Sequence, residues 1–150
     1  MNMKTCNNHE IYMRHALEIS LKGQGYVYPN PLVGAVIVRD GHIISEGYHE
    51  RFGGAHAEIN ALRNCDSNGG TMYVTLEPCS HYGKTPPCVD AIIKSGIIKV
   101  VCAMEDPNPI ESGAGFKKLM DSGIIVINGI LEKEAKTINA EYINFLSIKK

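Results

Sequence analysis

Four side chains in the middle of the sequence have the chemistry of a metal site. His56 and Glu58 stand two positions apart, and Cys79 and Cys88 follow later, separated by the eight residues Ser80–Pro87. One imidazole and two thiolates give a tetrahedral zinc ion three protein ligands and leave its fourth position to water. Zinc brings the pKa of that water toward neutrality, and the carboxylate of Glu58 can take up the released proton. The four residues therefore predict a catalytic zinc site.

Enzymes that remove an amino group from a nucleobase-like ring use the same set of side chains. In these deaminases His and Cys residues hold the zinc ion, and a Glu that is not a ligand acts as general acid and base. Their usual signature has two residues between the cysteines, so the eight residues between Cys79 and Cys88 are a long insertion. A lone His-x-Glu is a chance match in most proteins, but its joint occurrence with the cysteine pair favours a metal site. A closed structural site, with His81 or another residue as the fourth ligand, is the alternative.

The composition is that of a single globular domain with no sign of nucleic-acid binding. The chain has 150 residues and a formal charge of -1, from 15 Lys and Arg against 16 Asp and Glu, whereas a nucleic-acid interface needs a clustered basic excess. No apolar run could span a bilayer and the N-terminus has no signal-peptide core, so we expect a cytoplasmic protein. Five cysteines, an odd count, disfavour a disulfide framework. Metal binding therefore best explains Cys79 and Cys88, and Cys65 and Cys102 suit the core.

Hydrophobic periodicity and turn signals predict the elements that must position the candidate metal ligands. We expect helices at residues 8–22, 56–65, 86–94, 113–121 and 131–147, and strands at residues 32–39, 42–48, 71–76, 97–104 and 124–128. The turn signal Asp40-Gly41 joins the first two strands into an antiparallel hairpin. The strict alternation after Glu58 implies right-handed crossovers and a parallel run of strands. The fold class is therefore α/β, a three-layer α/β/α sandwich with a five-stranded mixed sheet.

Two of the predicted helices begin at the candidate ligands. His56 and Glu58 fall at the start of one helix, and Cys79 and Cys88 lie near the start of the next. Two helix N-termini can therefore converge on one ion, where the positive ends of their dipoles favour ionised thiolates.

Further stretches of the chain are more specific than this core pattern. They are Tyr28–Gly34, Gly54–Glu58, Leu76–Cys88 and Asp106–Pro109. Together they resemble the deaminase domain of the riboflavin-biosynthesis deaminase/reductase, within the cytidine and deoxycytidylate deaminase superfamily. The resemblance extends over residues 10–146, and its most specific part is the insertion that ends in Thr-Pro-Pro-Cys. The tRNA adenosine and cytidine deaminases resemble the chain only in the shorter signature.

The resemblance implies a substrate, diaminohydroxy-phosphoribosylamino-pyrimidine, whose ring amine is hydrolysed to give the aminouracil nucleotide and ammonia in riboflavin biosynthesis. In the family's pattern, His56, Cys79 and Cys88 match the Zn2+ ligands, and Glu58 matches the proton shuttle. Asn30, His49 and Lys84 match positions that line the substrate pocket. Asp106 and Asn108 match a loop that borders this pocket. The amide of Asn30 can donate and accept at a pyrimidinone edge, and Lys84 is the one cation of the cysteine loop.

Each substrate-binding assignment has a plain structural alternative. Asn30 can be a turn residue before a strand, and His49 and Lys84 can be solvated surface side chains. Asp106 and Asn108 can cap a turn between two prolines.

The chain departs from the resemblance at two places. The family's common form continues into a reductase domain that uses NADPH, whereas this chain ends at Lys150. We therefore expect residues 1–150 to form a single deaminase domain with no reductase activity. The family often has a basic residue between two glycines after the Asp-Pro-Asn-Pro loop, where this chain has Ala114. Either Lys84 carries more of the phosphate binding, or the substrate differs.

Two other functions stay open at this point. The chain could deaminate another base or nucleoside, such as cytidine, guanine or a tRNA adenosine, although its balanced charge weighs against tRNA. It could also be a zinc-stabilised binding module, a partner for a separate reductase chain, with four protein ligands on the metal. Glu58 weighs against that module, because a structural site does not need the carboxylate. The resemblance further implies a homo-oligomer, at least a dimer.

Overall fold

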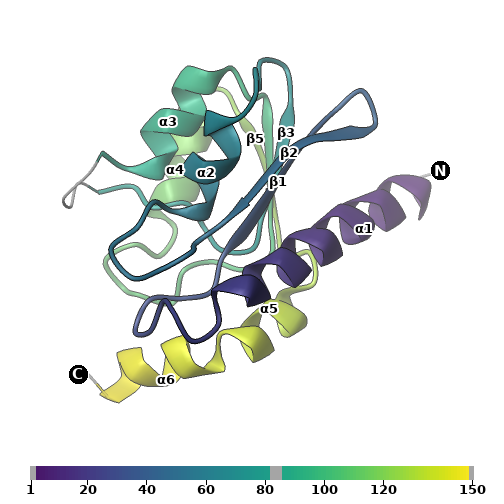
Figure 1. The fold of residues 1–150 in the computed structure, drawn as a ribbon. Coiled ribbons are helices and arrows are strands. Elements are labelled where there is room, and N and C mark those ends of the chain that lie inside the picture. Colours follow the sequence, from purple (N-terminus) through teal and green to yellow (C-terminus); the bar gives the residue numbers. More distant parts are fainter. Residues whose placement is uncertain (1–2, 82–85, 149–150) are drawn as a thin grey trace.

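A five-stranded mixed sheet forms the centre of the protein, with helices on both faces (Figure 1). The computed structural model describes residues 3–81 and 86–148. The strands are β1 (Gly34–Arg39), β2 (His42–Tyr48), β3 (Thr71–Val74), β4 (Lys99–Cys102) and β5 (Ile125–Asn128), in the order β2-β1-β3-β4-β5. Strand β1 is antiparallel to β2 and β3, whereas β3, β4 and β5 are parallel. The predicted sheet, led by one hairpin, is confirmed.

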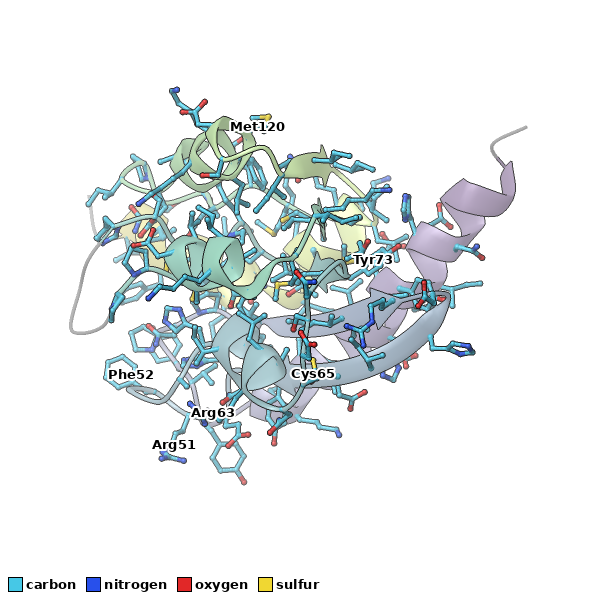
Figure 2. All side chains as sticks on the ribbon, turned by 90° about the horizontal axis from the view of Figure 1, so that it is seen from above. Arg51, Phe52, Arg63, Cys65, Tyr73 and Met120 are labelled. Atoms are coloured by element: carbon cyan, nitrogen blue, oxygen red, sulfur yellow. The ribbon has the colours of Figure 1, made fainter. Side chains whose placement is uncertain are left out.

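The helices form the two outer layers of the sandwich. One face of the sheet carries α2 (Ala57–Arg63), α3 (Cys88–Ser95) and α4 (Ala114–Asp121); the other carries α1 (Met3–Ser20), the 3-10 turn η1 (Leu21–Gly23), α5 (Glu132–Ile138) and α6 (Ala140–Ile148). Figure 2 shows Tyr73 of β3 on the side of α1, where its hydroxyl lies 2.7 Å from His9 Nδ1. None of the helices in the described residues has the length and apolar character to cross a membrane.

The prediction of one continuous C-terminal helix at residues 131–147 is wrong. The chain leaves the helix at Asn139, whose backbone has φ -101° and ψ 24°. The Asn139 side chain accepts a hydrogen bond from the Leu32 backbone N–H at 2.7 Å and donates one to the Leu32 carbonyl at 2.9 Å. This buried amide joins the break between α5 and α6 to the loop before β1, so a tertiary contact fixes the bend.

The central strands β1, β3 and β4 are mostly apolar, because helices cover both of their faces. Val36 in β1, Val74 in β3 and Val100 in β4 are all fully buried. Continuous apolar runs of this kind are typical of strands that lie between two helical layers.

Helix α2 packs against β2 at backbone distance because Gly47 has no side chain. A Cβ atom at Gly47 would lie 2.6 Å from the backbone nitrogen of Ala61 and 2.7 Å from the carbonyl oxygen of Ala57. The Asn60 amide also donates to the Tyr48 carbonyl at 2.9 Å. Because α2 begins beside His56, this close packing sets the position of the candidate metal ligand relative to the sheet.

We expect Gly47→Ala to lower the free energy of unfolding by about 2 kcal/mol, because the added methyl group must push α2 away from β2. Urea denaturation followed by circular dichroism measures this change. Glu50→Ala, at an exposed position just after β2, is the control and should leave the midpoint unchanged. Equal midpoints for both variants would contradict the packing argument.

Candidate active site

Three metal-ligating side chains converge where α2 and α3 begin. His56 immediately precedes α2, Cys88 is the first residue of α3, and Cys79 lies on the segment that follows β3. Their ligand atoms all lie within 4.8 Å of one another. His56 Nδ1 is 3.2 Å from Cys88 Sγ and 3.8 Å from Cys79 Sγ. This is the donor set of a catalytic zinc site, with three protein ligands and one open position.

Hydrogen bonds within the cluster determine which of its side chains hold a proton. The hydrogen bond from the Cys88 side chain, with help from His56, lowers the pKa of Cys79 to about 4. The bond to Cys79 raises the pKa of His56 to about 9. The thiol of Cys88, which donates to Cys79 and is buried, has a raised pKa. Since a metal binds the deprotonated ligands, binding must release protons from His56 and Cys88.

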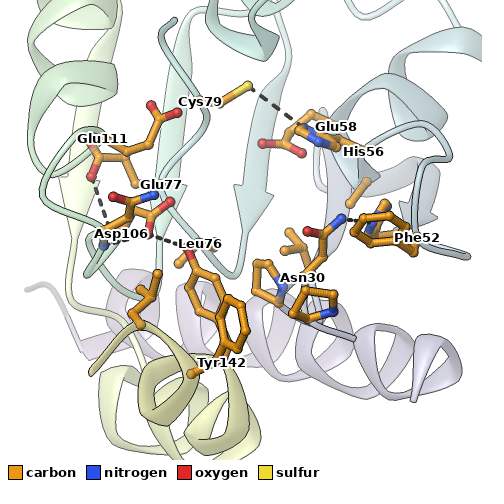
Figure 3. Close-up of a pocket in the computed structure, with 18 residues that line it drawn as sticks. Asn30, Phe52, His56, Glu58, Leu76, Glu77, Cys79, Asp106, Glu111 and Tyr142 are labelled. Atoms are coloured by element: carbon orange, nitrogen blue, oxygen red, sulfur yellow. Dashed lines mark hydrogen bonds between the residues drawn. The ribbon is translucent and has the colours of Figure 1, made fainter. Parts of the chain in front are cut away.

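Glu58 lies in the first turn of α2 and is almost completely buried. Burial is the main cause that raises the pKa of its carboxyl group to about 7. Figure 3 shows Glu58 beside His56, facing the same cavity as Cys79. A carboxyl group with a pKa near neutrality can both accept and return a proton, as a general acid and base must.

A cavity of about 460 Å³ opens beside the three ligands. It is lined by residues from five segments, at positions 29–33, 49–58, 76–79, 106–111 and 142–146. This volume suits a small-molecule ligand. The cavity therefore offers room for a ring-containing substrate next to the candidate metal site (Figure 3).

Asn30 and His49 form a hydrogen-bonded pair in the cavity wall. Nδ1 of His49 lies 3.0 Å from the carbonyl oxygen of Ala55, which can only accept, so this nitrogen carries the proton. His49 Nε2 then accepts from the Asn30 amide nitrogen at 3.2 Å. Burial lowers the pKa of His49 and favours this neutral form. The Asn30 amide is thereby oriented with its oxygen toward the cavity (Figure 3).

Asp106 and Asn108 also line the cavity, and Figure 3 shows Asp106 on the wall opposite Asn30. The Asp106 carboxylate accepts from the Asn108 backbone N–H at 3.0 Å and from the Tyr142 hydroxyl at 2.9 Å. Burial raises the pKa of Asp106. Asp106 thus caps its own turn and also borders the cavity, so its two interpretations are compatible. The candidate phosphate ligand Lys84 lies outside the described residues.

His81 is not part of the ligand cluster. Its Nδ1 contacts the carboxylate of Glu111. Within residues 3–81 and 86–148, His56, Cys79 and Cys88 are the group of side chains close enough to share a metal ion. This geometry argues against the closed structural site in which His81 would be the fourth ligand.

Several residues of the cavity wall escaped the sequence analysis. Tyr142, Phe145 and Leu146 come from α6, and Glu77 and Glu111 come from segments on either side of α3 and β4. The apolar residues of α6 follow an ordinary helical pattern, which does not distinguish cavity residues from core residues. Glu77 stands two positions before Cys79 in the most specific motif, which is the one available sequence signal.

Comparison with known proteins places the chain in a family. Residues 6–104 match the family described as cytidine and deoxycytidylate deaminase zinc-binding region, and this stretch contains all three candidate ligands. The chain is also 52% identical to the diaminohydroxyphosphoribosylamino-pyrimidine deaminase of Buchnera aphidicola, over 88% of this chain and 91% of that protein. The chain belongs to the riboflavin-biosynthesis deaminases of this family. The resemblance read from the motifs is thereby confirmed.

Longer relatives and solved structures agree with this assignment. The chain is 50% identical to the riboflavin biosynthesis protein RibD of Aquifex aeolicus, over 91% of this chain but 39% of that protein. It therefore spans less than half the length of that relative. The crystal structure of the deaminase/reductase from Thermotoga maritima matches 97% of this chain and 43% of its own with a TM-score of 0.92 and 48% identity. The cytidine deaminase-like fold is confirmed, and the family match supports zinc as the metal of the cluster.

We expect the purified protein to bind about one zinc ion per chain, as three protein ligands with one open position predict. His56→Ala, Cys79→Ser and Cys88→Ser should each lose this zinc. Cys65→Ser is the matched control, because Cys65 is a free, half-buried thiol outside the cluster. Metal analysis after dialysis against a weak chelator measures the outcome. Full zinc content in any of the three ligand variants would contradict the assignment.

Proposed function

We propose that this protein hydrolyses the ring amine of diaminohydroxyphosphoribosylamino-pyrimidine and releases ammonia and the aminouracil nucleotide. The carrying observation is the cluster of His56, Cys79 and Cys88 at the wall of one cavity that the buried Glu58 also lines. The 52% identity to a protein named for this deaminase activity, over 91% of that protein, supports the choice of substrate.

The reaction replaces the bond between a ring carbon and its amino nitrogen with a C–O bond, and the ring stays intact. His56, Cys79 and Cys88 would hold a zinc ion, which would supply hydroxide at near-neutral pH. Glu58 takes one proton of the attacking water and passes it to the neighbouring ring nitrogen. It then takes the second proton, from the new hydroxyl group on the ring carbon, and gives it to the amine, which leaves as ammonia as the carbonyl bond forms. The buried position of Glu58 beside the metal ligands suits these proton transfers, because a proton on a carboxylate shielded from bulk water is passed to the leaving group rather than to solvent.

The cavity walls divide the recognition of the substrate between them. The Asn30 oxygen, held in direction by His49, can accept an N–H of the ring. Asp106 and Tyr142, paired on the opposite wall, can bind ribose hydroxyl groups. The described residues of the lining include no Lys or Arg. Lys84, which lies outside the described residues, is the proposed contact for the phosphate.

Deamination of a cytidine-like nucleoside is the second candidate. The lack of a cation among the described lining residues favours it, as does Ala114 at a position that is often basic in the family. A substrate profile separates the two candidates. Turnover of cytidine, without turnover of the ribosylamino nucleotide, would overturn the first proposal.

We expect Glu58→Gln to lower kcat for ammonia release by about 10³-fold, within the usual range for removing a general acid and base, while the variant keeps its zinc. The assay is ammonia release from the ribosylamino pyrimidine nucleotide by the zinc-loaded protein. Glu50→Gln, at an exposed position, is the control and should be fully active. A fully active Glu58→Gln variant would falsify the proton-transfer role.

We expect Asn30→Leu to lower kcat/KM by about tenfold to a hundredfold, because a buried ring N–H of the substrate would lose its acceptor. Steady-state kinetics measure this change. Asn144→Leu, at an exposed position on α6 close to the cavity residues, is the control. If both variants keep the kcat/KM of the unaltered protein, Asn30 is only a turn residue.

A further inference from the structure

Two segments of the chain meet underneath the metal ligands and are joined by a buried carboxylate. Glu77, two residues before Cys79, reaches across to the segment that carries Asp106. Its Oε1 accepts the backbone N–H groups of Asp106 and Gly113, both at 3.0 Å, and its Oε2 accepts that of Phe116 at 3.1 Å. Glu77 therefore ties the loop after β4 and the start of α4 to the cysteine segment.

A second buried carboxylate, that of Glu111, reaches from the loop before α4 back to the cysteine segment. Glu111, in the loop before α4, accepts the backbone N–H of Ser80 at 3.1 Å and lies 3.4 Å from the Ser80 hydroxyl. Its other oxygen contacts His81. Ser80 directly follows the candidate ligand Cys79, and Figure 3 shows Glu111 and Cys79 on the same side of the cavity. The loop before α4 therefore holds the cysteine segment at Ser80, the residue next to the candidate metal ligand Cys79.

The two segments are also in backbone contact. A Cβ atom at Gly115 would lie 2.1 Å from the carbonyl oxygen of Pro78, so no side chain fits between them. Together, Glu77 and Glu111 form a reciprocal cross-link between the segment with the metal ligand and the segment with Asp106 and Asn108. A burial cost for each carboxylate is offset by these backbone donors.

We propose that Glu111 is a positioning residue for the reaction: by holding Ser80, it fixes the Cys79 sulfur relative to the wall formed by Asp106 and Asn108. Partners that orient metal ligands typically change metal affinity or activity by about 10–100-fold when they are removed. The separation between the reacting carbon and the sugar end of the substrate is fixed, so the distance between their two binding segments must be fixed as well. The catalytic part of this inference rests on the proposed function.

Glu111 could instead act through its negative charge, and side-chain length separates these two roles. Glu111→Asp keeps the charge but is one methylene too short to reach the Ser80 N–H. Glu111→Gln loses the charge but keeps an oxygen at the same reach. A positioning role therefore predicts that Asp is the damaging substitution and Gln the tolerated one.

The experiment compares both variants in the cobalt-substituted and the zinc-loaded protein. For Glu111→Asp we expect altered thiolate-to-cobalt absorption bands, a metal affinity lowered by about tenfold in competition with a chromophoric chelator, and kcat/KM lowered by at least about tenfold. Glu111→Gln should keep the absorption bands and stay within about threefold of the unaltered protein in affinity and rate. Glu50→Asp, at an exposed position outside this loop, is the control and should change neither.

Two results would overturn the proposal. One is a Glu111→Asp variant with unaltered absorption bands and affinity; the other is a Glu111→Gln variant that loses as much as Glu111→Asp. If Glu111→Asp does not fold, Glu111→Ala, which also removes the acceptor for the Ser80 N–H, takes its place in the comparison, and equal bands and affinities for Glu111→Ala and Glu111→Gln would overturn the proposal. If the unaltered protein fails to turn over the ribosylamino nucleotide, the proposed function fails, whereas the cobalt spectra and the metal affinities still test the role of Glu111.

Discussion

The active site depends on one topological constraint, which brings three chain segments to the same edge of the sheet. Because β2 and β3 are both antiparallel to β1, they run in the same direction as β4. Helices α2, α3 and α4 follow β2, β3 and β4 and cover one face, so all three begin at the carboxyl ends of these strands. Ligand sites in α/β sheets form at such an edge. Here it gathers His56, Cys79 and Cys88 within 4.8 Å.

The cavity contains several carboxylates, and their surroundings give them different tasks. Glu77 and Glu111 face backbone N–H groups that satisfy and hold them. Asp106 is oriented by the Tyr142 hydroxyl and its own turn. For Glu58, burial outweighs every stabilising contact, and its pKa rises to about 7. Carboxylates with several backbone donors act as structural anchors, whereas the desolvated Glu58 becomes able to exchange a proton.

Local patterns were sufficient to predict the sheet and the candidate ligand set, because strand alternation, turn residues and ligand spacing each depend on residues that are close together in the sequence. The wall made by α6 could not be predicted in this way. It exists because Asn139 bonds to Leu32, 107 positions away in the sequence, and bends the chain between α5 and α6. Glu111 gave no signal either, since a single Glu in a polar loop is indistinguishable from a solvated one until the fold brings Ser80 to it.

Hydrogen bonds between uncharged groups fix the orientation of the Asn30 side chain in the cavity wall. The Ala55 carbonyl sets the tautomer of His49, and the neutral imidazole then sets the direction of the Asn30 amide. The His49 ring also stands edge-on to His56, with 5.5 Å between their centroids, so this chain of contacts ends at a candidate metal ligand. Protonation of His49 would place a donor opposite the Asn30 nitrogen and turn the amide over. In the proposed complex, a ring N–H would then meet the amide nitrogen, so the proposed recognition by Asn30 requires a neutral His49.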